Sequence, residues 1–463
     1  MHKKLAEIKD NLIICIKNGD VSTVKNLLLE LIENKILNEA LFFAIEINNY
    51  QIVKLLLESG ADVHHNNDFA LIYSSQEGYY DIVKLLLEYG ADIHAVNDRA
   101  FRWSVDSGYC EIIRLLLDNG TDIHISNDAA LWKSAMHGYY EIVKLLLDYG
   151  ADIHAKDGRA IIAAANDGHY EVVKLLLESG ANADAKDDYS SALASSAKHG
   201  HDDVVRLLLE YGANVNDNHA LKWSALKLSA ENGHYEMVKL LLEKGADVHA
   251  DNGGALKWSA HNGHDKIVKL LLENGADIHA NDDSAFQSSA QNGKNKVVKL
   301  LLKNGADIHA NNDSALRYSA LCGHYELVKI LLENGADVHA YNDLALEWSA
   351  RNGHDKVVKL LLENGADIHA NNDIALEWSA RNCYDKVVKI LLENGADIHA
   401  NNDLAFRTSV SNGQYEVVKL LLENGADVHA DNDYALGRSA ENKYQNIIEL
   451  LLEYSANKKI FQN

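Results

Sequence analysis

The chain has 463 residues, of which 47% are hydrophobic and 24% charged, a composition that excludes an intrinsically disordered protein. Its 44 Lys and Arg against 68 Asp and Glu give a formal net charge of -24, which disfavours nucleic acids and anionic membranes as partners. A single globular core is also excluded, because such cores stop growing at about 250–300 residues.

We expect neither a signal peptide nor a membrane span at the N-terminus. The longest uncharged stretch there, residues 11–16, is too short for either. The four cysteines, Cys15, Cys110, Cys322 and Cys383, lie far apart, without the paired spacing of a zinc site or a disulfide framework. This pattern predicts a reducing, intracellular location, in the cytoplasm or the nucleus.

A glycine followed by alanine or threonine recurs along most of the chain. The spacing is 30 residues, except for 32 and 33 residues on either side of Gly212. Each period predicts a helix, a tight turn, a second helix and a connector, so the fold class is an all-α helix-turn-helix repeat solenoid of about fifteen helix pairs. The repeated glycines are Gly60, Gly90, Gly120, Gly150, Gly180, Gly212, Gly245, Gly275, Gly305, Gly335, Gly365, Gly395 and Gly425.

The spacing divides the chain into five regions. We expect an N-terminal capping unit over 1–37, regular repeats over 38–180, two longer irregular repeats over 181–245, regular repeats over 246–432, and a C-terminal capping repeat with a tail over 433–463. The first helix pair is predicted to begin near Asp10 and the second near Asn38. The last helix should end near Tyr454, where Ser455 replaces the usual glycine.

One regular unit shows how the residues specify the two helices. Asp343 is predicted to cap a short helix over 344–352 by accepting hydrogen bonds from the free amides of its first turn. Gly353 should end that helix as a left-handed residue, and Cys383 occupies the same position one repeat later. A second, apolar helix over 355–364 and a polar, extended connector over 366–372 follow. The predicted buried face of the first helix carries Ala345, Leu346, Ser349 and Ala350.

Two registers fit the irregular unit over 213–245. Residues 220–225 are identical to residues 255–260. The first helix therefore either starts early, at this segment, or follows a longer connector that contains Trp223. We favour the early start.

The repeated segments resemble the ankyrin repeat. The family pattern appears here as Ser314-Ala315-Leu316, then Gly323-His324, then an apolar helix, and finally Gly335-Ala336-Asp337-Val338-His339. The repeats differ from the family in their 30-residue length, in the lack of the Thr-Pro start and in the final His, and they look like those of the large ankyrin-repeat families of giant DNA viruses. The resemblance implies short connector fingers and a scaffold that binds partner proteins on its concave surface, in the cytoplasm of a cell or of a viral host.

The concave surface should be formed by the outward face of the first helices, and aromatic residues gather there in two runs. Trp, Tyr and Arg dominate the energy of protein interfaces, so these residues are the candidate binding site, although the same positions could instead pack between adjacent helices. The candidates are Phe43, Tyr73, Trp103, Trp132, Trp258, Tyr318, Trp348, Arg351, Trp378 and Arg381. Arg351 and Arg381 follow Trp348 and Trp378 by one helical turn, within cation–π reach.

The connector histidines repeat with the same period but should not bind metal, because equivalent atoms of neighbouring repeats lie about 10 Å apart. Hydrogen bonding within the connector is the expected role, and the resemblance adds hydroxylation by a cellular oxygenase. Catalysis needs one unrepeated set of side chains, so we expect no enzyme and no cofactor. The chain should act as a monomeric scaffold for protein partners. The alternatives are a substrate or decoy for a host modifying enzyme and a structural spacer.

Overall fold

The computed structural model describes residues 2–29, 34–187, 190–216 and 224–461. Within these ranges there are 30 helices and one isolated bridge, between Lys186 and Ser191, which confirms the all-α prediction of about fifteen helix pairs. The chain divides into two compact units, Met1–Ala225 and Leu226–Asn463. The boundary between them falls inside the two irregular repeats.

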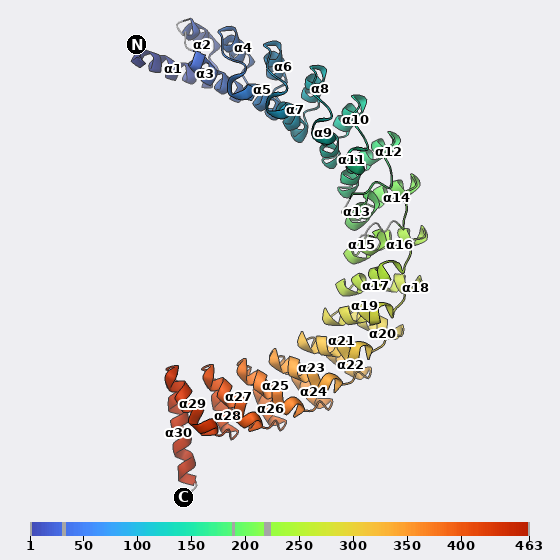
Figure 1. The fold of residues 1–463 in the computed structure, drawn as a ribbon, viewed down its shortest axis with the longest axis vertical. Helices are drawn as coiled ribbons and strands as arrows, with labels where there is room; N and C mark the ends of the chain where they lie inside the picture. The colour runs from blue at the N-terminus through green and yellow to red at the C-terminus, as the bar shows by residue number, and fades with distance from the viewer. Residues whose placement is uncertain (1, 30–33, 188–189, 217–223, 462–463) are drawn as a thin grey trace. The chain divides into compact units, whose positions relative to one another are not determined.

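In the first unit, the first helices of successive repeats pack against one another in one layer and the second helices form another layer (Figure 1). The first helices are α1 (His2–Lys17), α3 (Asn34–Glu46), α5 (His65–Glu77), α7 (Ala95–Ser107), α9 (Ile125–Met136), α11 (Ala155–Asn166) and α13 (Ala192–His199). The second helices are α2 (Val21–Leu28), α4 (Tyr50–Glu58), α6 (Tyr80–Glu88), α8 (Cys110–Asp118), α10 (Tyr140–Asp148), α12 (Tyr170–Glu178) and α14 (Asp202–Glu210).

The second unit has the same two layers. Its first helices are α15 (Ala225–Asn232), α17 (Ala250–Asn262), α19 (Ala280–Gln291), α21 (Ala310–Leu321), α23 (Ala340–Arg351), α25 (Ala370–Arg381), α27 (Ala400–Ser411) and α29 (Ala430–Glu441). Its second helices are α16 (Tyr235–Glu243), α18 (Asp265–Glu273), α20 (Asn295–Lys303), α22 (Tyr325–Glu333), α24 (Asp355–Glu363), α26 (Asp385–Glu393), α28 (Tyr415–Glu423) and α30 (Gln445–Phe461).

The core lies between the two layers and follows the predicted pattern. In α23, the predicted face of Ala345, Leu346, Ser349 and Ala350 is buried, and in α24 Val357, Val358 and Leu361 are buried opposite it. The Ser349 hydroxyl is satisfied within its own helix, donating to the Leu346 carbonyl at 3.0 Å. Each helix therefore buries one apolar face, and the repeat depends on its neighbours for the rest of its core.

The turn between the two helices of a repeat requires a left-handed residue. Gly353 has a φ of 76°, as predicted, and the Cys383 that replaces this glycine one repeat later keeps a left-handed φ of 65°. A residue with a Cβ is strained in this region, by roughly 1–2 kcal/mol. Cys383 is also exposed, so little packing offsets the strain.

Substitution of Cys383 by glycine is therefore expected to raise the free energy of unfolding by about 0.5–1.5 kcal/mol. A urea titration followed by circular dichroism would measure the change. Cys322→Gly is the matched control, because Cys322 has a φ of -89° and glycine should destabilise there. A lower denaturant midpoint for Cys383→Gly would contradict the assignment of strain to this turn.

Three predicted helix boundaries are wrong. The first pair begins at His2 rather than near Asp10, and the second pair begins at Asn34 rather than near Asn38. The last helix does not end near Tyr454 but continues to Phe461. Ser455 explains this last difference. The second helices from α4 to α28 are each followed by a glycine, which adopts the left-handed conformation easily, whereas a serine does not.

The preferred register of the second irregular repeat is also wrong. Its first helix, α15, begins at Ala225, and Ser224 precedes it outside the helix, so the helix does not start early. Trp223 lies outside the described residues. In the preceding repeat, Ser191 caps α13 by accepting a hydrogen bond from the Ala194 N–H at 3.2 Å.

Candidate functional site

Most connectors make the same tight turn just before the next first helix. Ahead of the regular part of α23, Tyr341, Asn342 and Asp343 have φ values of 54°, 60° and 58°, three left-handed residues in a row. Asn and Asp tolerate this conformation because their short polar side chains can bond to nearby backbone groups. The same turn begins α5, α7, α9, α11 and each first helix from α17 to α29.

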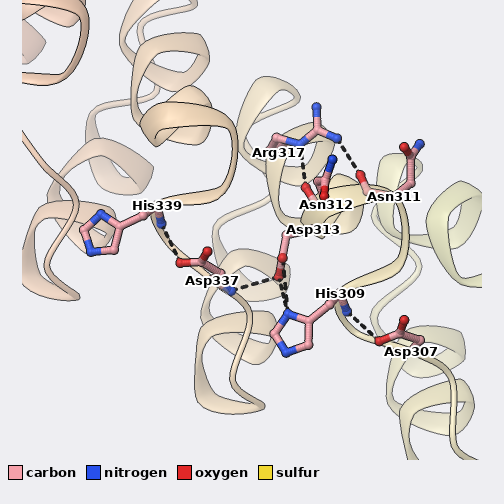
Figure 2. Close-up of polar contacts among 8 residues, drawn as sticks. All are labelled: Asp307, His309, Asn311, Asn312, Asp313, Arg317, Asp337 and His339. Atoms are coloured by element: carbon pink, nitrogen blue, oxygen red, sulfur yellow. Dashed lines mark hydrogen bonds and ion pairs between the residues drawn. The ribbon is translucent and has the colours of Figure 1, made fainter.

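The aspartate that ends the turn is buried and links one connector to the next. Asp313 Oδ1 accepts a hydrogen bond from the Asp337 N–H at 2.8 Å and lies 3.2 Å from His309 Nδ1 (Figure 2). Asp337 in turn accepts the His339 N–H at 2.9 Å. The same link joins Asp68 to Asp92, Asp128 to Asp152, Asp283 to Asp307, Asp343 to Asp367, Asp373 to Asp397, and Asp403 to Asp427.

The prediction that Asp343 caps its own helix is therefore wrong. Its left-handed backbone directs the carboxylate to the next connector, where it accepts the Asp367 N–H at 2.7 Å. The predicted extended, polar connector is also wrong in part. Ala366 is buried, and Asn371 and Asn372 are left-handed rather than extended.

Glycine replaces the turn aspartate on both sides of the irregular repeats. Gly158 and Gly253 keep the left-handed turn, with φ values of 79° and 77°. A Cβ would meet the Cβ of Ala185 at 2.9 Å in the first case and that of Ala280 at 2.8 Å in the second. These turns pack closely on the next connector, but glycine supplies no carboxylate to bind it.

In the repeats whose turn ends in aspartate, the connector histidine bonds to that aspartate, as predicted. The His279 ring lies 3.0 Å from Asp283, and this hydrogen bond raises the pKa of His279 above its usual value. The rings otherwise face solvent. In the described part of the chain, no three His, Cys, Asp or Glu side chains are arranged to hold a metal ion.

In three repeats an arginine from the first helix covers the left-handed turn. Arg317 donates from Nε to the Asn312 carbonyl at 2.9 Å and from Nη2 to the Asn311 carbonyl at 2.8 Å (Figure 2). Arg102 and Arg407 make the same pair of bonds, at 2.9 to 3.2 Å. The turn therefore presents two carbonyl oxygens that match the fork of a guanidinium.

The predicted aromatic residues are half-buried, and the two predicted arginines are exposed. The half-buried residues are Phe43, Tyr73, Trp103, Trp132, Trp258, Tyr318, Trp348 and Trp378, and the exposed ones are Arg351 and Arg381. Each aromatic ring thus packs against neighbours and still presents part of its surface to solvent. We call this side of the first helices the first-helix face.

Near the N-terminus, the aromatic run is part of a larger cluster that the sequence pattern missed. Phe42 lies 5.7 Å from both Phe69 and Tyr73, measured between ring centroids, while Phe43 lies under the Lys17 ammonium at 4.8 Å. A cavity of about 380 Å³ opens beside these rings, between α3 and α5. The adjacent pair Phe42-Phe43 was the available signal, because two neighbouring aromatics on a half-buried helix cannot both point into the core.

The middle of the face pairs single aromatic rings with cations. The Arg99 guanidinium lies 4.5 Å from the Trp103 ring, and Arg159 lies 4.7 Å from Trp132. Lys257 lies 5.7 Å from Trp258. These contacts hold the rings in place, since a cation above a ring is attracted by its negative face.

A third group lies on α21, α23 and α25. Tyr318 and Trp348 have ring centroids 5.6 Å apart, and Trp378 is contacted by Arg351 at 4.1 Å and Arg381 at 5.1 Å. Arg351 was expected to pair with Trp348 in its own helix, but it lies over Trp378 of the next repeat. We call these five residues the tryptophan patch.

The ankyrin-repeat family model matches the chain almost end to end, in overlapping segments that run from residue 12 to residue 462. The chain is an ankyrin-repeat protein. Ankyrin repeats mediate protein–protein interactions, and members of the family are typically scaffolds without catalytic activity. No curated protein shows significant similarity to the chain.

The ankyrin repeats of this protein differ among themselves on the first-helix face far more than in the core. The buried serine recurs, as in Ser319, Ser349 and Ser379, while the position before it is Tyr318, Trp348 or Trp378 in these repeats and a serine or a threonine in others. Because the residue before the buried serine varies, the first-helix face is the surface on which one repeat can be told from another.

Among the described helices, none is long and apolar enough to cross a bilayer.

Proposed function

We propose that this ankyrin-repeat protein is a scaffold that binds a partner protein through the tryptophan patch. The proposal depends on one observation: Trp348 and Trp378 are held by Tyr318, Arg351 and Arg381 and remain partly exposed. Trp, Tyr and Arg dominate interface energies. Rings that are already held in place lose little conformational entropy on binding, so a larger part of the interaction energy appears as affinity.

The net charge extends the proposal to the kind of partner, and the cysteines extend it to the compartment in which this protein acts. A net charge of -24 favours a partner with a basic surface, because opposite charge speeds association and suppresses wrong partners. All four cysteines are free, which fits a reducing compartment such as the cytoplasm, including the cytoplasm of a cell infected by a giant virus. We propose that the protein acts there as a monomer.

Photo-crosslinking would test the proposed surface without removing any residue of the tryptophan patch. A photoreactive phenylalanine analogue in place of Leu321, at the end of α21, should form light-dependent adducts with the partner. Leu321 has the same position in α21 that Arg351 has in α23, and it lies one helical turn after Tyr318 on the first-helix face. The same analogue in place of Lys359, exposed on the second helix α24, should form none.

Adducts only from position 359 would place the partner on the second helices and contradict the proposal. The alternatives also make different predictions. A structural spacer predicts adducts from neither position. A substrate for a histidine-modifying enzyme predicts contacts at the connectors, where the His309 and His369 rings are more than half exposed, rather than at Leu321.

A further inference from the structure

The chain shows what the left-handed turn can bind. In the three repeats with arginine at the fourth position after the turn, the guanidinium occupies the two turn carbonyls. Arg317 is buried in this position, with only 7% of its surface exposed. Arg407 gains a further partner, because its Nη1 lies 2.6 Å from Asp431 of the next connector. Both guanidinium groups donate to carbonyl oxygens of the turn, and the Arg407 guanidinium also pairs with a carboxylate.

The next two repeats after Arg317 have the same turn but the opposite charge. Glu347 and Glu377 occupy the position of Arg317 in α23 and α25. The turn backbone is unchanged: Tyr341 and Asn342 have φ values of 54° and 60°, and Asn371 and Asn372 have 51° and 56°. An ionised glutamate accepts hydrogen bonds and donates none, so it cannot take the role of the arginine.

The surroundings of Glu347 also favour the arrival of a cation. Burial raises the pKa of Glu347, against the opposing effects of Arg351 and of a hydrogen bond from Asn371, and the nearby Glu377 raises it further. The charge of Glu347, which burial and Glu377 disfavour, is stabilised when a positive group comes beside it. Arg351 only partly fills this role, because its guanidinium lies over the Trp378 ring at 4.1 Å.

We propose, as an extension of the proposed function, that each of these two turns receives an arginine side chain of the partner protein. The guanidinium donates to the carbonyls of Tyr341 and Asn342 in one turn, and of Asn371 and Asn372 in the next. Glu347 or Glu377 pairs with its charge, and the tryptophan patch lies alongside. The sites of successive repeats lie about 10 Å apart. In a polyproline II segment, residues three apart lie on the same face about 9 Å from each other, so two such arginines can fill both sites.

Arginine fits these turns better than lysine does. Its guanidinium is a planar fork with fixed donors, which can reach two neighbouring carbonyl oxygens at once, as Arg317 does here. An ammonium is a more strongly hydrated point charge and matches no such pair. The inferred partner segment is therefore a stretch of polyproline II conformation with the form Arg-x-x-Arg.

Isothermal calorimetry with the full-length protein would test the proposal, using the peptide acetyl-Arg-Ala-Ala-Arg-amide as the probe. The control peptide carries citrulline, the neutral isostere of arginine, at both positions. We expect the arginine peptide to bind at least tenfold more tightly than the citrulline peptide. Equal binding of the two peptides, or none by either, would overturn the proposal.

A double substitution, Glu347→Arg with Glu377→Arg, should fill both turns with arginines of the chain itself and abolish binding of the arginine peptide. This variant is expected to fold, because Arg102, Arg317 and Arg407 occur naturally at the same position. Glu347→Gln with Glu377→Gln provides a second test. It removes the charge and adds an amide that can occupy one turn carbonyl, as the Gln287 amide does with the Asp282 carbonyl, so it should weaken binding at least fivefold. Gln287→Arg, in α19, is the matched control and should leave binding unchanged.

Unchanged binding in both glutamate variants would show that the peptide binds elsewhere and would overturn the inference. The proposed function has a separate readout. If adducts form at position 321 in the photo-crosslinking experiment while the arginine peptide does not bind, the partner uses the tryptophan patch without the turns. If the peptide binds and no adducts form, the turns recognise arginine but the patch is not the docking surface.

Discussion

Replacing Asp343 by alanine should lower the local free energy of unfolding by about 3 kcal/mol. The Asp343 carboxylate is 4% exposed and accepts the Asp367 N–H at 2.7 Å. Its loss removes a charge-assisted hydrogen bond that links two connectors. Alanine would also have to adopt the left-handed φ of 58°, which aspartate tolerates better.

Hydrogen exchange is the appropriate measurement, because long repeat arrays need not unfold in one step. Amides of α23 to α25 should exchange about a hundredfold faster in Asp343→Ala, the factor that corresponds to nearly 3 kcal/mol. The control is His339→Ala. Its ring contacts the same carboxylate, but its side chain is 57% exposed, so its loss should change exchange less than tenfold. Equal effects of the two substitutions would contradict the role given to the buried aspartate.

Two turns of the chain naturally lack the aspartate that links one connector to the next. Gly158 and Gly253 stand where the other turns have aspartate, and the repeats between them are the irregular ones. The boundary between the two compact units, after Ala225, lies in this segment. The aspartate link is thus replaced by glycine at the turns that flank the irregular repeats, while Asp184 accepts the Asn214 N–H at 2.6 Å within them.

The sequence predicted the helix pairs and their buried faces because both depend on short-range features. The apolar positions of α23 recur at helical spacing, and Gly353 marks a turn that only a left-handed residue can make. The same reasoning predicts a left-handed residue at Cys383, which occupies the position of Gly353 one repeat later. Patterns of this kind are complete within one repeat and need no knowledge of its neighbours.

The connector could not be predicted in the same way, because its structure depends on contacts between repeats. Asp343 looks like a helix cap when only its own helix is considered, but it bonds to the backbone 24 residues later. Three left-handed residues in a row are also rare, so the Asn-Asn-Asp pattern by itself predicts an extended segment. The repetition of Asn and Asp at fixed positions was the signal, since these residues tolerate the left-handed region.

The candidate site was predicted by residue type but not by partner. Trp348 and Trp378 lie on the first-helix face, whereas Arg351 reaches across to the next repeat and contacts Trp378. Phe42 and Phe69 were not predicted, because neither occupies the first-helix position that Phe43, Tyr73 and Trp103 share. The proposed role of Glu347 in pairing with an incoming arginine depends on the bonds that Arg317 makes to its turn, and these bonds are not predictable from the sequence.

The central claim is that the partner binds at the tryptophan patch, and the double substitution Trp348→Ala with Trp378→Ala tests it directly. We expect at least a hundredfold loss of affinity for the partner captured by the unmodified protein, because residues of this kind typically contribute 2 kcal/mol or more each at the centre of an interface. Both rings are half-buried, so the substitution should also reduce stability, by about 1–2 kcal/mol per ring, less than for fully buried aromatics.

The control that separates binding from stability is Trp103→Ala with Trp258→Ala, which removes two half-buried rings from the same face outside the patch. Affinity for the partner, measured by calorimetry on purified variants alongside their thermal melts, should remain unchanged in this control and fall at least a hundredfold in the patch variant. Similar melts and similar affinities for the two variants would contradict the claim and assign Trp348 and Trp378 to packing between repeats.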